Sequence, residues 1–253
     1  MPVAGAPMLE RMMERILSAQ TPFELVVATT TDPGDDRIEA LCRAIAVGCF
    51  RGHPTDLLDR HYQAALAWEA DQVVKIPSDC PLVDPAVIDR VLGFARENEG
   101  RFDFVSNLHP PTYPDGSDVA VMPFAVLETA WAEARRPFER EHTTPFIWDR
   151  PERFRIGNVV WETGADLAMT HRLTVDYPED YALVAAVFDA LWSASRPLFH
   201  LDEILEFLAD HPEVYAQNAR YAGVNWYRQH LGELRTVTGA ATRPAPPSTR
   251  AAS

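Results

Sequence analysis

Short apolar runs alternate with helical patterns along the first hundred residues of the chain. The runs "ELVVAT" (24–29), "VGCF" (47–50), "QVVKI" (72–76) and "FDFVSN" (102–107) have the length and composition of buried strands. Between them, apolar residues recur at helical spacing after Asp32, after Pro54 and after Asp84. Strands separated by helices of roughly ten to fifteen residues predict right-handed βαβ units. We therefore expect an α/β fold with a mostly parallel sheet flanked by helices.

The pattern changes after residue 107. "NLHPPTYPDGSDVAVM" (107–122) indicates a proline-rich loop that runs into a short strand, and a helix (124–134) and a strand (154–160) are expected next. Pro178 opens a long helix, and the sequence beyond Arg196 is helical throughout. From Thr236 the chain is rich in Pro, Thr, Ala and Ser. We expect an α/β domain (1–196), a helical extension (197–235) and a disordered tail (236–253).

Composition and charge narrow the function classes. The 253 residues carry a net charge of −14, which argues against nucleic acid or an anionic membrane as a partner. A metal ion or a few converging cations could still reverse the field around a small anionic ligand. No apolar run approaches the ~18 residues of a membrane span, and the start has no signal-peptide pattern. The three cysteines form no CxxC pair, which favours reduced thiols and a cytoplasmic location.

Several common catalytic motifs do not occur in this sequence. No two glycines stand at i, i+2, so the GxGxxG dinucleotide fingerprint is excluded. The GxxxxGK[ST] phosphate loop, the GxSxG nucleophile motif and the HExxH zinc motif are also missing. "EREH" places Glu139 near His142, which is a weak zinc signal without a second histidine one turn away.

Two aspartates follow predicted strands. Asp79 comes after "VVKI", and Asp176 comes after "LTV". Ligands of open parallel sheets bind outside the carboxyl ends of the strands, where two carboxylates can share one Mg²⁺ with substrate phosphates. The alternative is that both aspartates are helix caps or turn residues, because Pro81 and Pro178 follow closely.

Six segments give the chain a family resemblance from about Gly5 to Tyr227. They are "VVATTTDP", "RGHPTDLLDRHYQAA", "SDCPLVDP", "TYPDGSDVAV", "EREHTTPFI" and "LTVDYPED". In this order they resemble the SpsF-type cytidylyltransferases of spore-coat polysaccharide synthesis, which are relatives of the CMP-KDO and CMP-sialic acid synthetases. The resemblance implies the nucleotide-diphospho-sugar transferase (GT-A-like) fold. It also implies transfer of CMP from CTP to a hydroxyl of a sugar-acid-like acceptor, release of pyrophosphate, a Mg²⁺ cofactor and a homodimer with "YPDGSDVAV" at the interface.

The resemblance also implies roles for particular residues. Asp79 and Asp176 would hold Mg²⁺, and His142 would help to deprotonate the attacking hydroxyl, unless it is structural. On the nucleotide side stand Thr29, Thr30, Arg60 and Ser78 beside Asp79; the alternative for Arg60 is a solvated helix face. On the acceptor side stand Tyr113, Asp115, Asp118, Arg140, Glu141 and Arg172. Arg172 would hold an acceptor carboxylate or pair with a neighbour.

The chain departs from the family at its beginning. Related enzymes open with a strand and a loop whose arginines and lysine hold the β- and γ-phosphates, and "VAGAPMLERM" aligns with the end of that loop. Ala6 stands where the family has lysine, and Ala120 where relatives often have glutamate. The absent first strand would leave a sheet edge exposed. Two hypotheses follow: a cytidylyltransferase, or a catalytically impaired relative that binds nucleotide or sugar or serves as a partner subunit.

Overall fold

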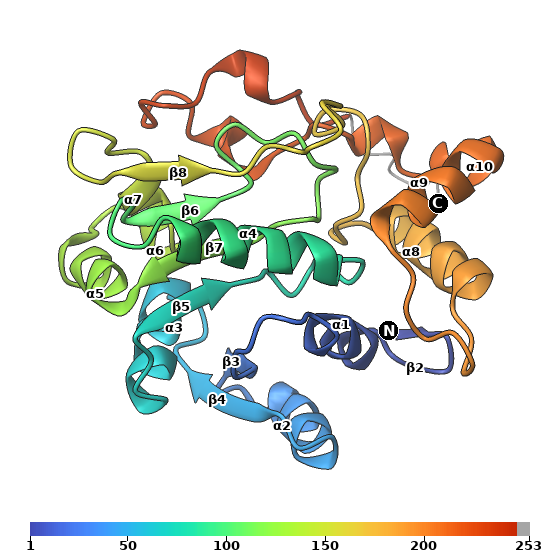
Figure 1. Ribbon diagram of the computed structural model, residues 1–253, viewed down its shortest axis with the longest axis horizontal. Helices are drawn as coiled ribbons and strands as arrows, with labels where there is room; N and C mark the ends of the chain where they lie inside the picture. Colours follow the sequence, from blue (N-terminus) through green and yellow to red (C-terminus); the bar gives the residue numbers. More distant parts are fainter. Residues whose placement is uncertain (247–253) are drawn as a thin grey trace, which may run out of the picture.

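The computed structural model describes residues 1–246 and confirms the α/β fold (Figure 1). Strand β3 (Val26–Thr30) pairs in parallel with β4 (Gly48–Gly52). A separate four-stranded sheet has the order β5-β7-β6-β8. Its strands are β5 (Gln72–Lys75), β6 (Phe104–Ser106), β7 (Ala120–Pro123) and β8 (Ile156–Asn158). The strands predicted in the first hundred residues are therefore present within two residues of their expected bounds.

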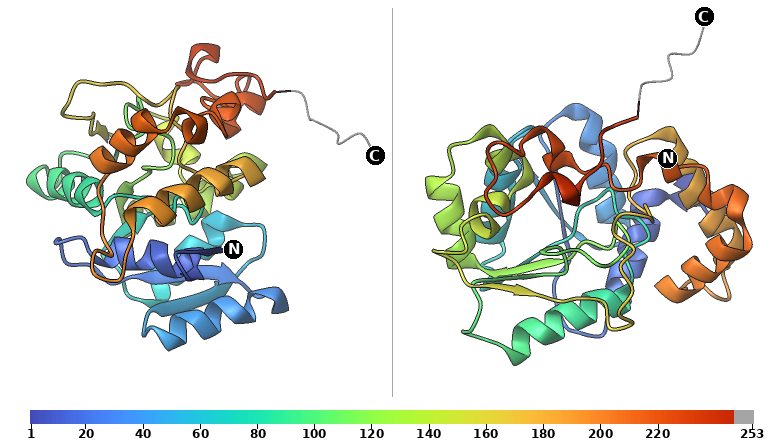
Figure 2. Two further views of the ribbon diagram at one scale, coloured as in Figure 1. Left: turned by 90° about the vertical axis from the view of Figure 1, so that its right-hand side faces the viewer. Right: turned by 90° about the horizontal axis from the view of Figure 1, so that it is seen from above.

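Helices cover both faces of the four-stranded sheet, with α4 on one face and α3 and α5 on the other (Figure 2). The helices of the α/β part are α1 (Met8–Leu17), α2 (Asp36–Ala44) behind the 3-10 turn η1 (Pro33–Asp35), α3 (Leu57–Ala67), α4 (Pro85–Glu97), α5 (Phe124–Glu133), α6 (Pro137–His142), α7 (Pro145–Trp148) and α8 (Pro178–Leu191). Two hydrophobic clusters result, one around α1, α4 and α8 and the other around α3, α5 and α7.

The four-stranded sheet is mixed, which refines the expectation of a mostly parallel sheet. Strands β6 and β8 pair in parallel, whereas β7 runs antiparallel to both β5 and β6. The reason is the connection: β6 leads to β7 through the loop 107–119, and only a long crossover, usually through a helix, can return a strand in the parallel direction.

The predicted helix starts have the local chemistry that the sequence indicated. The Asp32 carboxylate accepts from Gly34 N at the start of η1, and the Asp84 carboxylate accepts from Ala86 N at the start of α4. On α4, apolar side chains at i, i+1, i+4 and i+5 are buried, beginning with Val87 and ending with Leu92. A capped start and an apolar stripe together fix the direction and the buried face of this helix.

The C-terminal part is helical, as predicted, and packs beside the N-terminus (Figure 2). It contains α9 (Leu201–Asp210), α10 (Pro212–Tyr215) and the 3-10 turns η2 (Ala219–Tyr221), η3 (Trp226–Gln229) and η4 (Gly239–Ala241). At the N-terminus, β1 (Pro2–Val3) and β2 (Ala6–Pro7) form a small hairpin that contacts α8. The Tyr181 hydroxyl of α8 donates to the Pro2 carbonyl at 2.6 Å and ties this hairpin to α8.

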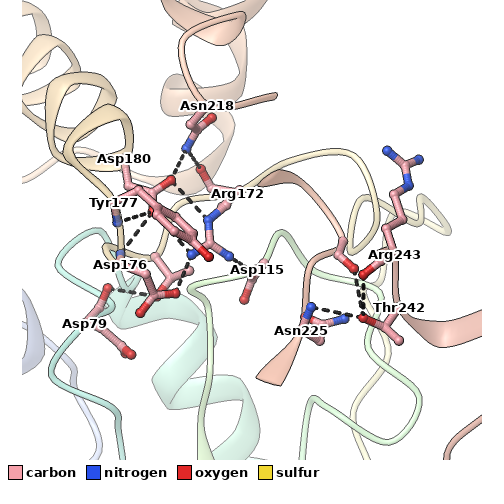
Figure 3. A network of polar contacts seen from close by, with 12 residues as sticks. Asp79, Asp115, Arg172, Asp176, Tyr177, Asp180, Asn218, Asn225, Thr242 and Arg243 are labelled. Atoms are coloured by element: carbon pink, nitrogen blue, oxygen red, sulfur yellow. Dashed lines mark hydrogen bonds and ion pairs between the residues drawn. The ribbon is translucent and has the colours of Figure 1, made fainter. Parts of the chain in front are cut away.

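Residues 236–246, expected as the start of a disordered tail, are hydrogen-bonded to the body of the protein. Thr236 donates through its backbone N and its hydroxyl to buried Asp149, both at 2.9 Å. Thr242 and Arg243 both donate to the Gly223 carbonyl (Figure 3). Composition favours disorder here, but buried polar groups that need partners hold this segment in place. The rest of the predicted tail (247–253) lies outside the described residues.

None of the helices in the described residues is both long and apolar enough to span a membrane.

Candidate active site

The structure brings Asp79 and Asp176 to the same edge of the molecule. Asp79 follows β5 in a tight turn, and its backbone carbonyl accepts from Val175 N at 2.8 Å and from the Thr174 hydroxyl at 3.1 Å. These bonds hold the two aspartate-bearing segments against each other (Figure 3). The negative charge of Asp176 also helps to raise the pKa of Asp79.

The segment before Asp176 is not a regular strand, contrary to the sequence prediction. Residues 173–175 are extended but irregular, and a single β-bridge joins Arg172 to Asp115. The alternative interpretation of Asp176 as a helix cap is also wrong, because Tyr177 occupies the N-cap position of α8. The carboxylate that caps this helix belongs to Asp180, which accepts from the backbone N of Asp176 and of Tyr177, both at 3.0 Å.

Arg172 lies at the centre of a buried ionic network. Its side chain is 2% exposed and forms ion pairs with Asp115 and Asp180, each at 3.0 Å, and with Asp176. Burial opposes the charge of Arg172, but the hydrogen bonds that it donates to Asp180 and the charges of the neighbouring carboxylates outweigh burial, so the pKa of Arg172 is raised. Asn218 donates to the Arg172 carbonyl and to Asp180, both at 2.9 Å. These contacts favour the alternative in which Arg172 pairs with neighbouring carboxylates over the one in which it holds a carboxylate of the acceptor.

Four carboxylates from three segments gather at this edge: Asp79, Asp115, Asp118 and Asp176. Burial, together with the neighbouring carboxylates, raises the pKa of Asp115 to about 8 and that of Asp118 to about 6. Burial is also the main cause of the raised pKa of Asp79. A cation at this edge would relieve the mutual repulsion of these groups.

Thr29 and Thr30, at the end of β3, both donate to one carboxylate. Their hydroxyls lie 2.8 Å and 2.5 Å from Asp35 Oδ2, and Thr30 N also donates to this atom at 3.1 Å. These hydrogen bonds lower the pKa of Asp35. No motif in the sequence points to Asp35, yet this residue holds the loop that carries both threonines.

Arg60, Ser78 and Asp79 are among the residues that line a cavity of about 830 Å³. Arg60 lies on α3 and donates to the His53 carbonyl, and its Nε has no partner among the described residues. Lys75, the single lysine of the sequence, lines the same region from β5. The charge of Lys75 lowers the pKa values of Asp79, Asp118 and His142. Two cations and a serine thus line this cavity.

The "EREH" segment lies on α6 and serves several contacts. Arg140 is engaged with Asp56, at 2.6 Å, and with the Trp131 carbonyl, at 2.7 Å, so it joins α6 to α3 and α5. Glu141 is exposed. His142 stacks on Trp226 with ring centroids 3.7 Å apart, and burial lowers its pKa to about 4.

Tyr113 and the loop that follows are largely buried within the chain. The Tyr113 hydroxyl donates to Glu162 at 3.2 Å, and burial raises its pKa to about 12. Ser117, Val119 and Ala120 are each at most 4% exposed, which leaves little of this segment for the expected dimer interface. Oligomeric state stays a prediction.

The candidate site thus combines the joined Asp79 and Asp176 segments, a threonine loop and two cations that line a cavity. Comparison with known proteins gives the class of the protein: the sequence model of the cytidylyltransferase family matches residues 1–224. The chain belongs to this family, and it is a nucleotidyltransferase enzyme whose reaction class is transfer of CMP from CTP.

Individual relatives are similar over most of their length. Protein MJ1063 of Methanocaldococcus jannaschii is 32% identical over 210 residues, which cover 81% of each chain. The spore coat polysaccharide biosynthesis protein SpsF of Bacillus subtilis is 27% identical and covers 75% of this chain and 76% of its own. A cytidylyltransferase structure from Leptospira borgpetersenii aligns with a TM-score of 0.79 and 28% identity, covering 85% of this chain and 88% of its own. The predicted family is therefore confirmed.

Proposed function

We propose that this enzyme transfers CMP from CTP to a hydroxyl of a sugar-acid-like acceptor and that Asp79 and Asp176 hold the Mg²⁺ required for the transfer. The observation that carries the proposal is the joining of the two aspartate segments by hydrogen bonds to the Asp79 carbonyl. Among residues 1–246, no group of three or more His, Cys, Asp or Glu is arranged to hold a metal. Two carboxylates are nevertheless what Mg²⁺ needs when substrate phosphates complete its coordination.

Bound Mg²⁺ would supply charge neutralisation at the α-phosphate and the leaving pyrophosphate. The acceptor oxygen attacks the α-phosphorus, and the bond to the β-phosphate oxygen breaks. Arg60 and Lys75 would bind the triphosphate in a chain of net charge −14, since both line the same cavity as Ser78 and Asp79. The phosphates would then lie beside the metal site.

The nucleoside would lie against the threonine loop at the end of β3. Asp35 holds both threonine hydroxyls and leaves the loop with one conformation. The acceptor proton needs a base, and His142 is neutral at pH 7 because burial lowers its pKa to about 4. A neutral imidazole can accept the proton, although its low pKa makes it a weak base. Arg172 has no free face for an acceptor carboxylate because three carboxylates already surround it.

The test is pyrophosphate release from CTP with Mg²⁺ and a panel of acceptors that includes 3-deoxy-manno-octulosonate and neutral sugars. We expect Asp79→Asn and Asp176→Asn each to lower the rate by about 100-fold or more, because the metal is misplaced. Asp189→Asn, on an exposed position of α8, is the matched control and should keep the wild-type rate. If either site variant turns over like the control, the metal assignment is wrong.

A further inference from the structure

The ring of His142 is held by an aromatic side chain from the C-terminal part of the chain. Trp226 of η3 stacks on it, with the ring centroids 3.7 Å apart and an angle of 21° between the ring planes. Within residues 1–246, no side-chain hydrogen bond reaches either ring nitrogen of His142, whereas Nδ1 of His61 lies 2.7 Å from the Leu57 carbonyl oxygen. The His142 side chain is half-buried. Its nitrogens are therefore available to a substrate, and its orientation depends on the indole.

The backbone next to His142 is strained. Thr143 has φ 69° and ψ −53°, and Thr144 N donates to the His142 carbonyl at 2.8 Å. This is a γ-turn with positive φ, which is rare and costly for a β-branched residue. Strain of this kind persists where surrounding contacts hold it, and it concentrates at functional sites. Thr143 is 0% exposed, and its hydroxyl lies 3.4 Å from Nδ1 of His61, the neighbour of Arg60 on α3.

The two neighbours of Trp226 are bonded to a later part of the chain. Asn225 Nδ2 and the Tyr227 hydroxyl both donate to the Ala241 carbonyl, at 2.9 Å and 2.7 Å. Asn225 N also donates to the Thr242 hydroxyl at 3.1 Å (Figure 3). Because the chain is held on both sides of Trp226, the indole has little freedom to move away from His142.

Aromatic packing holds the rest of the indole. Trp148 of α7 meets it edge to face, with centroids 6.4 Å apart, and Phe138 of α6 lies at the same centroid distance. Both side chains are at most 4% exposed. Trp226 itself is half-buried and packs against the hydrophobic cluster around α3, α5 and α7. The indole thus connects this core to the His142 ring.

We propose that Trp226 is a positioning residue for the transfer: it holds the His142 ring in the orientation in which a ring nitrogen receives the proton of the acceptor hydroxyl. The inference rests on the proposed function, in which His142 is the base. The family model matches residues 1–224, so it assigns no role to Trp226. As the acceptor oxygen bonds to the α-phosphorus, its O–H bond breaks, the proton passes to His142, and pyrophosphate leaves. A weak base contributes to such a step mainly through its position.

The test is steady-state kinetics of Trp226→Leu, Trp226→Phe and Trp192→Leu with CTP, Mg²⁺ and the panel of acceptors named above. Leucine removes the flat face and should lower kcat by about tenfold or more, with KM for CTP within about twofold of wild type. Phenylalanine keeps an aromatic face and should restore kcat to within about threefold of wild type. Trp192→Leu removes a half-buried indole at the end of α8 and is the matched control, which should keep wild-type kinetics.

A double-mutant cycle separates positioning from packing. In the His142→Gln background, Trp226→Leu should change kcat by less than about twofold, because its effect passes through His142. An indole with a merely structural role would lower kcat by the same factor in both backgrounds. Urea unfolding checks that each variant is folded, and Trp226→Met replaces Trp226→Leu if the latter is not.

Two results would overturn the proposal. One is wild-type kcat in the folded non-aromatic variant, or a loss that phenylalanine does not reverse. The other is an equal loss with and without His142. Either result, together with turnover by the wild type, refutes the role of Trp226 alone. If the wild type turns over no acceptor of the panel, the proposed function fails and the role of Trp226 fails with it.

Discussion

Replacement of Asp180 by asparagine tests the network that places the metal site. Asp180 is 0% exposed and forms an ion pair with Arg172 at 3.0 Å. It also accepts from the backbone N of Asp176 and of Tyr177 and from Asn218. Asparagine keeps the shape, but it removes the charge and turns one acceptor into a donor that faces other donors.

The magnitude follows from the burial of the pair. Removing one partner of a buried ion pair costs about 3–5 kcal/mol, since the other charge is left without compensation. Asp115 and Asp176 still contact Arg172, so we expect the lower end, about 3 kcal/mol. For a domain of this size, that lowers Tm by roughly 6–12 °C.

The assay is thermal and urea unfolding of Asp180→Asn beside Asp189→Asn, which changes an exposed residue of the same helix. The control should stay within about 0.5 kcal/mol of wild type. Asp180→Asn should also reduce turnover, because it releases the backbone of Asp176. A loss of stability below about 1 kcal/mol would refute the description of this network as a buried, mutually dependent unit.

Three further predictions concern the surroundings of the site. Lys75→Met should weaken CTP binding by about tenfold or more in calorimetry, with Tm nearly unchanged, because one of two cations near the triphosphate is lost. Gly116→Ala should destabilise the chain by roughly 1–3 kcal/mol, since Gly116 has φ +101° and a Cβ there would lie 2.6 Å from the Leu173 carbonyl carbon; unchanged urea unfolding would contradict this. Burial lowers the pKa of His109 from 6.5 to about 4, so the folded state favours the neutral ring. The stability that this ring contributes is present above pH 6.5 and is lost as the pH falls toward 4. His109→Phe should remove about 2–3 kcal/mol of the difference in unfolding free energy between pH 7 and pH 4.5, and an unchanged difference would count against a buried neutral histidine.

The sequence predicts the local elements well because their signals are local. Asp84 with the apolar stripe behind it gives α4 its start and its buried face. The two aspartates were singled out because the pattern predicts a strand before each of them, and the structure confirms that strand for Asp79 but not for Asp176. The direction of β7 was not predictable from periodicity, since alternation is the same in parallel and antiparallel strands.

Features that join distant residues had no sequence signal. Asn218 bonds to Asp180 across 38 positions, and nothing in the spacing of the two residues marks the pair. Lys75 stands inside an apolar run, so the sequence pattern marks it only as part of a strand.

The most direct test of the central claim is calorimetric titration of CTP into the chain with Mg²⁺ and with EDTA. The account predicts binding that depends on Mg²⁺ and is lost in Asp79→Asn but retained in Asp189→Asn. Equal binding of CTP in EDTA, or unchanged Mg²⁺-dependent binding by Asp79→Asn, would contradict a metal site at Asp79 and Asp176.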